Sequence, residues 1–127
     1  MAGKTVVAAL LVAVLAGCGG HERKPPPSKA AFAKEADGIC AKATTRSGRV
    51  ARLRALRAPT GQEDLYSHWL RAERDALELA KPRKAEPRPE DPDPAVSVAI
   101  AQGKIAGYAR RLGAEGCAKG ATGTLPP

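Results

Sequence analysis

The stretch Phe32-Ala-Lys-Glu-Ala-Asp-Gly-Ile-Cys40 sets a cysteine beside the apolar stripe of an amphipathic helix. Apolar and small residues then continue at intervals of three or four positions, at Ala43, Ser47, Val50 and Leu53. This spacing predicts one helix over about residues 29–57, with Ser28 as its N-cap and Pro59 beyond its end. Because Cys40 lies at the border of the stripe, its side chain can reach a neighbouring helix.

Two more segments have the same periodicity. Residues 61–80 follow the sequence Thr60-Gly-Gln-Glu63, which matches a capping box that would satisfy two free backbone N–H groups. Residues 94–112 follow Asp93, a helix-capping residue, and precede Gly113, which suits a C-terminal cap. No segment has the alternation of a strand. We therefore expect an all-α fold, a small three-helix up-down bundle.

Polar, proline-rich segments separate the last two predicted helices and end the chain. Residues 81–93 carry so many prolines and charges that they can neither continue a helix nor bury apolar surface. We interpret them as a disordered, solvated linker, although long loops are also often functional. Residues 120–127 are rich in Gly, Thr and Pro and are expected to form a disordered tail. The helical domain is thus expected to span residues 28–119.

The N-terminal residues have the organisation of an export signal. Lys4 is followed by an uncharged run over residues 5–17, which ends in the small residues Ala16 and Gly17. The run is shorter than the roughly 20 residues of a membrane-spanning helix. An uncleaved membrane helix is therefore the weakest interpretation.

The sequence Leu15-Ala-Gly-Cys18 resembles the processing site of bacterial lipoproteins. The resemblance implies attachment of diacylglycerol to the Cys18 sulfur and cleavage before Cys18, so that residues 1–17 form a removed signal peptide. Residues 18–27 would then be a lipidated cysteine with a Pro-rich tether. Two acyl chains such as palmitate anchor a protein stably to a membrane, whereas one chain binds reversibly. The alternative is an ordinary secretory signal in which the cysteine stands by chance.

Two further cysteines, Cys40 and Cys117, remain in the expected mature chain. An even number of cysteines in an oxidising compartment indicates one structural disulfide. Such a bond would stabilise the fold by roughly 4 kcal/mol in the chain-entropy model. It would staple the first predicted helix beside the third. The alternatives are a reactive thiol or a metal ligand, but neither cysteine lies in a CxxC motif, and only His21 and His68 could supplement them.

The run from Phe32 to Cys40 and the sequence Leu112-Gly-Ala-Glu-Gly-Cys117 resemble motifs of short, uncharacterised lipoproteins of high-GC Gram-positive bacteria. The resemblance covers the signal, the start of the first predicted helix and the end of the third. It implies an extracytoplasmic helical lipoprotein in which Cys40 and Cys117 are the matching pair. It implies no reaction, because these motifs carry no known activity.

The chain of 127 residues has a formal net charge of +8. Removal of residues 1–17 leaves about 110 residues, enough for one small domain, and changes the charge little. In an exported protein, this excess favours anionic lipid or wall polymer as a partner, and we expect no nucleic acid. The cations expected to contact such an anionic surface are Arg49, Arg52 and Arg57. The competing interpretation is a solvated surface, which includes i,i+4 pairs of Arg71 with Asp75 and Arg74 with Glu78.

The sequence offers no set of side chains for catalysis. Asp64 and His68 have the i,i+4 spacing of two metal ligands, but no third ligand has suitable spacing, so a surface pair is the preferred interpretation. No glycine-rich phosphate loop, GxSxG or HExxH sequence is present. We therefore expect no enzymatic activity, no cofactor and no metal.

The function expected from the sequence is that of a lipid-anchored structural or interaction module at the extracytoplasmic face of the bacterial cell membrane. The alternative is a small-ligand-binding lipoprotein of the cell envelope. A binding protein would need a pocket of roughly 300 Å³ or more. A concave cavity beside Tyr66, Trp69 and Tyr108 would support that alternative.

Overall fold

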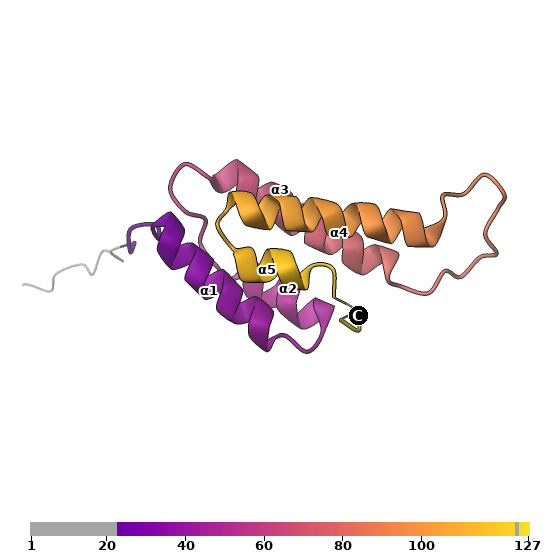
Figure 1. Ribbon diagram of the computed structural model, residues 1–127, viewed down its shortest axis with the longest axis horizontal. Helices are drawn as coiled ribbons and strands as arrows, with labels where there is room; N and C mark the ends of the chain where they lie inside the picture. The colour runs from indigo at the N-terminus through magenta and orange to yellow at the C-terminus, as the bar shows by residue number, and fades with distance from the viewer. Residues whose placement is uncertain (1–22, 124) are drawn as a thin grey trace, which may run out of the picture.

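A computed structural model describes residues 23–123 and 125–127, and this part of the chain is helical without strands (Figure 1). The all-α fold expected from the sequence is thereby confirmed. The expected signal peptide, the expected lipidation residue Cys18 and the first part of the tether lie outside the described residues. The helices are α1 (Lys29–Lys42), α2 (Arg46–Arg54), α3 (Glu63–Leu79), α4 (Pro94–Arg111) and α5 (Glu115–Gly120).

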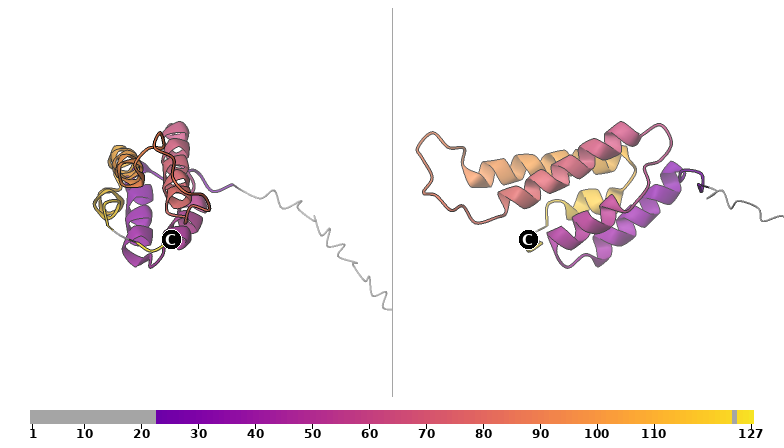
Figure 2. Two further views of the ribbon diagram at one scale, coloured as in Figure 1. Left: turned by 90° about the vertical axis from the view of Figure 1, so that its right-hand side faces the viewer. Right: turned by 180° about the vertical axis from the view of Figure 1, so that it is seen from behind.

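The helices form two layers. α3 and α4 run antiparallel as a long hairpin, and α1, α2 and α5 lie against it as a second layer (Figures 1 and 2). α5 contacts both α1 and α4, while α2 contacts both α1 and α3. The first and third predicted helices were expected side by side, whereas the structure places α5 between them. Five helices therefore occupy the described residues, where three were expected.

The helix expected over residues 29–57 is broken into α1 and α2. Ala43 leaves the helical conformation after α1, and Thr45 is extended, with φ −131° and ψ 153°. The Thr45 hydroxyl accepts a hydrogen bond from the backbone N–H of Gly48 at 3.1 Å, so it caps a new helix. Threonine competes with the helix through such local bonds, and the backbone therefore breaks at this point. The apolar stripe of the sequence nevertheless continues on both sides of the break.

The capping box expected at the start of α3 does not form. Gln62, not Thr60, is the N-cap residue, and it makes no side-chain capping bond. Glu63 Oε1 instead accepts from the backbone N–H of Gly61 at 3.2 Å. Gly61 has a φ of +73°, a left-handed conformation that glycine adopts without strain, and this turn moves the helix start to Glu63. α3 ends at Leu79, within one residue of the expected end.

The expected third helix corresponds to α4. The Asp93 carboxylate accepts from the N–H of Ala95 at 2.8 Å, as its N-cap position predicts. At the other end, Gly113 has a φ of +83°, and the N–H of Ala114 donates to the Ala109 carbonyl at 2.9 Å. This is a Schellman cap, and it reverses the chain so that α5 packs back on α4. α5 was not predicted, because six residues are too few to show a helical period.

The C-terminal residues were expected to be a disordered tail from residue 120. The structure instead includes Gly120 in α5 and buries Ala121 completely. The Pro126 carbonyl accepts from the N–H of Arg46 at 2.8 Å, which places the end of the chain beside the start of α2 (Figure 1). Residues 81–93 form the exposed connection between α3 and α4 and contain no helix.

The core lies between the two layers. The Phe32 ring meets the rings of Tyr66 and Trp69 edge-on, with centroids 5.4 and 6.3 Å away. Leu53 and Ile105 are completely buried beside them. Most of the other buried apolar residues are alanines, so the helices approach closely while each contact buries little apolar area.

Candidate functional site

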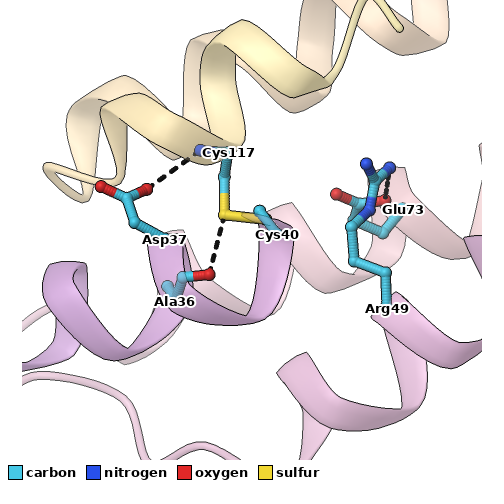
Figure 3. Close-up of a disulfide and its surroundings, with 6 residues drawn as sticks. All are labelled: Ala36, Asp37, Cys40, Arg49, Glu73 and Cys117. Carbon is cyan, nitrogen blue, oxygen red and sulfur yellow. Dashed lines mark hydrogen bonds and ion pairs between the residues drawn. A yellow bond between two sulfur atoms is a disulfide. The ribbon is translucent and has the colours of Figure 1, made fainter. Parts of the chain in front are cut away.

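Cys40 of α1 and Cys117 of α5 meet where these two helices pack against each other (Figure 3). Their Cα atoms are 5.2 Å apart and their sulfur atoms 2.03 Å apart, the distance of a disulfide. Asp37 Oδ1, one turn before Cys40, accepts a hydrogen bond from the Cys117 N–H at 2.9 Å. Cys117 Sγ also lies 3.2 Å from the Ala36 carbonyl oxygen; once bonded to Cys40 it has no proton to donate. The unexpected helix α5 is the element that brings Cys117 to α1.

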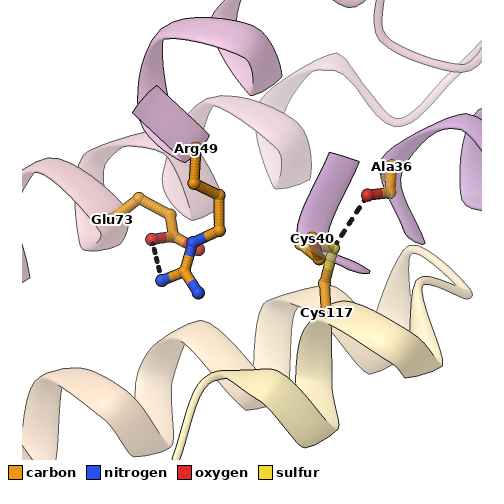
Figure 4. Close-up of polar contacts among 5 residues, drawn as sticks. All are labelled: Ala36, Cys40, Arg49, Glu73 and Cys117. Carbon is orange, nitrogen blue, oxygen red and sulfur yellow. Dashed lines mark hydrogen bonds and ion pairs between the residues drawn. A yellow bond between two sulfur atoms is a disulfide. The ribbon is translucent and has the colours of Figure 1, made fainter. Parts of the chain in front are cut away.

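Arg49 of α2 and Glu73 of α3 form an ion pair inside the fold (Figure 4). Arg49 Nη2 lies 2.8 Å from Glu73 Oε2, and the residues are only 2% and 0% exposed. Arg46, one turn earlier on α2, is 5% exposed. Burial lowers the pKa of Arg46 from its ordinary value, the nearby charge of Arg49 lowers this pKa further, and Glu73 opposes both effects. The cluster thus holds two cations against one carboxylate.

The structure does not bring the three arginines expected at an anionic surface together. The expectation that Arg49 contacts an anionic surface is wrong. Arg49 points inward to Glu73 and is buried, so no surface partner can reach it. Arg52 and Arg57 are exposed. Arg57 Nη1 donates to the backbone carbonyl of Lys24, so it ties the segment after α2 to the tether.

Arg52 lies at the rim of a groove between α1 and α2. This groove has a volume of about 560 Å³. Small and apolar residues of α1, including Gly38 and Ile39, line it together with Lys34 and Lys42. Glu35 is the single acidic residue of the lining, so the groove carries a net positive charge. We call this the α1–α2 groove.

A second hollow lies where the start of α3 meets the end of α4. It has a volume of about 680 Å³ and includes Asp64, His68, Tyr108 and Arg111 in its lining. The His68 and Tyr108 rings stack, with centroids 5.9 Å apart and planes inclined by 15°. A cavity beside Tyr66, Trp69 and Tyr108 was the observation that would support a ligand-binding protein. Tyr108 alone lines this hollow, because Tyr66 and Trp69 are enclosed in the core.

The described residues contain no group of three or more His, Cys, Asp or Glu side chains that could hold a metal ion. Within the same part of the chain, no helix is both long and apolar enough to cross a membrane.

Sequence reasoning missed the buried ion pair, although its signal was present. Glu73 lies four residues after Trp69 and three before Ala76, on the apolar face of α3. Arg49 likewise lies among the inward positions of α2, beside Val50. Two opposite charges on the apolar faces of two helices indicate a buried pair. Their separation of 24 residues hid this partnership from any local pattern.

Comparison with known proteins adds no relative: no family model, no curated protein sequence and no solved structure matches this chain. The function is therefore argued from the chain itself.

Proposed function

We propose that the chain is a lipid-anchored protein of the bacterial cell envelope, held through Cys18 at the extracytoplasmic face of the membrane, where it acts as an interaction module. The observation that carries the proposal is the distribution of the three cysteines. Cys40 and Cys117 lie at bonding distance, which suits an oxidising compartment. Cys18 follows Leu15-Ala-Gly, the setting of a lipidated cysteine.

In this proposal, the Cys40–Cys117 bond is a structural staple. Cys117 is 1% exposed and Cys40 is partly buried, so the side of the bond at Cys117 is closed to external thiols. It joins α1 to α5 across a sequence separation of 77 residues. The alanine-rich core gives the bond a larger share of the total stability than it would have in a well-filled fold.

The anchor is tested by mass spectrometry of the full chain expressed in a bacterium and extracted from membranes. We expect the N-terminal peptide of the mature protein to begin at Cys18 and to carry diacylglycerol. Cys18→Ala should abolish the modification and release the protein from the membrane. Cys40→Ser, which leaves the sequence Leu15-Ala-Gly-Cys18 intact, is the matched control and should remain lipidated. An unmodified N-terminus in the unaltered chain would refute the proposal.

We assign the anionic contact to a cationic face made by Lys34, Lys42 and Arg52 at the α1–α2 groove, and we add Arg57, an exposed cation of the segment after α2. Three of these residues line the α1–α2 groove, and all four are exposed. Arg57 donates to the Lys24 carbonyl, and this contact with the tether supports a position of the cations near it. Since six peptide units span at most roughly 20 Å, Lys24 cannot lie further than that from Cys18. A lipid on Cys18 would therefore hold this face within reach of headgroups or wall polymer.

Sedimentation with liposomes tests this contact. Arg52→Glu with Arg57→Glu in the Cys18→Ala background should reduce binding to anionic vesicles, and binding should fall with salt. Arg88→Glu with Arg110→Glu makes the same charge change at exposed positions elsewhere and is the control. If both double variants lose vesicle binding equally, binding depends only on the net charge of the protein, and the proposal of a defined cationic face is refuted.

A further inference from the structure

A second cationic groove lies between α2 and α3, with a volume of about 370 Å³. Three arginines line it, Arg54 from α2 and Arg71 and Arg74 from α3. Its apolar lining is made by Val50, Leu70 and Leu77. No acidic side chain contributes to this lining. We call this the α2–α3 groove.

Within the described residues, the acids expected to neutralise these arginines form no ion pair with them. Asp75, expected to pair with Arg71, lines a different hollow between α3 and α4. Glu78, expected to pair with Arg74, instead lies 2.7 Å from the Lys81 ammonium. Across residues 23–123 and 125–127, Arg54, Arg71 and Arg74 form no ion pair within 4.0 Å. Both i,i+4 expectations are therefore corrected, and the groove keeps three positive charges.

This arrangement has a definite chemical preference. Guanidinium groups present planar forks of N–H donors that match the oxygens of a phosphate. An apolar lining adds nothing to the binding of inorganic phosphate, but it stabilises an attached hydrocarbon chain by removing it from water. The volume lies at the lower end of the range of small-molecule sites, roughly 300–1,000 Å³.

We propose that the α2–α3 groove binds a single-chain anionic lipid. Its phosphate head lies against Arg54, Arg71 and Arg74, and its chain lies along Val50, Leu70 and Leu77. This site is separate from the cationic face of the α1–α2 groove, and its ligand does not depend on a lipid at Cys18. A failure of the anchor would therefore leave this inference standing, and the reverse also holds.

The probe is lysophosphatidic acid below its micellar concentration, titrated into the full chain carrying Cys18→Ala, with chemical shifts of ¹⁵N-labelled amides as the readout. We expect saturable shifts concentrated at residues 50–54 and 67–77. Arg54→Gln, Arg71→Gln and Arg74→Gln together should weaken binding by at least about tenfold, because charge-assisted hydrogen bonds to the phosphate are lost. The same number of exposed arginines is removed in the control, Arg23→Gln with Arg88→Gln and Arg110→Gln, which should bind as the parent does.

Two further probes separate the head from the chain. Lysophosphatidylcholine of the same chain length carries no net charge and should bind at least about tenfold more weakly. Inorganic phosphate should cause no saturable shifts at the same concentrations. Equal binding of lysophosphatidylcholine, equal binding of inorganic phosphate, or an equal loss in the control variant would each overturn the proposal. All variants change exposed side chains, and their circular dichroism should match that of the parent.

Discussion

At the scale of single residues, the Arg49–Glu73 pair is the contact that tolerates loss of one partner least. Replacing Glu73 by Gln leaves the Arg49 charge buried without a counter-ion, beside Arg46, which is also buried. Breaking one side of a buried pair costs about 3–5 kcal/mol of unfolding free energy. We expect a loss of this size for Glu73→Gln in urea unfolding followed by circular dichroism.

Two further variants test whether the loss comes from the stranded charge of Arg49. Glu78→Gln removes an exposed partner of Lys81 and should change stability by no more than about 0.5 kcal/mol. Arg49→Met with Glu73→Leu removes both charges and should cost less than Glu73→Gln alone, because no charge is left stranded. If the double variant has a lower unfolding free energy than Glu73→Gln, this explanation is contradicted.

The Tyr66 hydroxyl gives the fold a limit at alkaline pH. Its single proton faces the backbone carbonyls of Leu53 and Leu56, and burial raises the pKa of Tyr66 above its ordinary value. Above about pH 10 an unfolded tyrosine loses its proton while the folded one keeps it, so the unfolding free energy falls as pH rises. The contribution of this group is fully present below that pH.

Urea unfolding between about pH 8 and 11 measures this effect. Tyr66→Phe should be less stable than the parent at pH 8 because the hydroxyl no longer donates to the carbonyls of Leu53 and Leu56. The gap in unfolding free energy should narrow at alkaline pH. Tyr108→Phe is the matched control, since Tyr108 is only half-buried, and should keep the slope of the parent. A constant gap for Tyr66→Phe across the range would contradict the prediction.

At the scale of elements, glycines of α4 and its cap should respond in opposite directions to alanine. Gly113 has a φ of +83°, so Gly113→Ala strains the Schellman cap and should lose roughly 1–2 kcal/mol. Gly107 lies within α4, and a Cβ there would meet nothing within 4 Å. Gly107→Ala should therefore raise stability by roughly 0.5–1 kcal/mol. Thermal unfolding of both variants decides this, and effects of the same sign would contradict it.

The helices themselves were largely predictable, and the errors have local causes. Apolar periodicity located α3 and α4 and their ends to within two residues. It failed at Thr45, where a side-chain cap interrupts a stripe that continues unchanged on both sides. It also failed at α5, which has fewer than two turns and depends on the Gly113 reversal for its position. Periodicity reports which face is apolar and says little about breaks within that face.

At the scale of the whole molecule, the Cys40–Cys117 bond is expected to supply a large fraction of the stability. Cys40→Ser with Cys117→Ser should lower the unfolding free energy by about 2–5 kcal/mol. Cys18→Ser is the control for loss of a cysteine and should unfold as the parent does. The unaltered protein is denatured without a reductant and alkylated. Alkylation of both Cys40 and Cys117 would contradict the expected bond.

The assembly of the layers was beyond sequence reasoning. The structure sets Cys40 and Cys117 at bonding distance, but the helix that carries Cys117 was not predicted, so α1 was expected against α4. The expected anionic contact was also predicted only in part. Arg49, Arg52 and Arg57 lie in one segment of the sequence, but Arg49 turns inward while Arg52 and Arg57 are exposed. The orientation of Arg49 depends on the carboxylate of Glu73, 24 residues later in the sequence. The residue pattern of one helix does not reveal a partner on another helix.

The exposed connection between α3 and α4 also determines how the molecule would respond to trypsin. Lys81 and Arg88 each precede a proline and resist cutting, which leaves the bonds after Arg83 and Lys84 as the vulnerable ones in this connection. A cut there would separate a fragment containing Cys40 from one containing Cys117. The two pieces should nevertheless migrate as one species on a non-reducing gel and come apart when dithiothreitol is added.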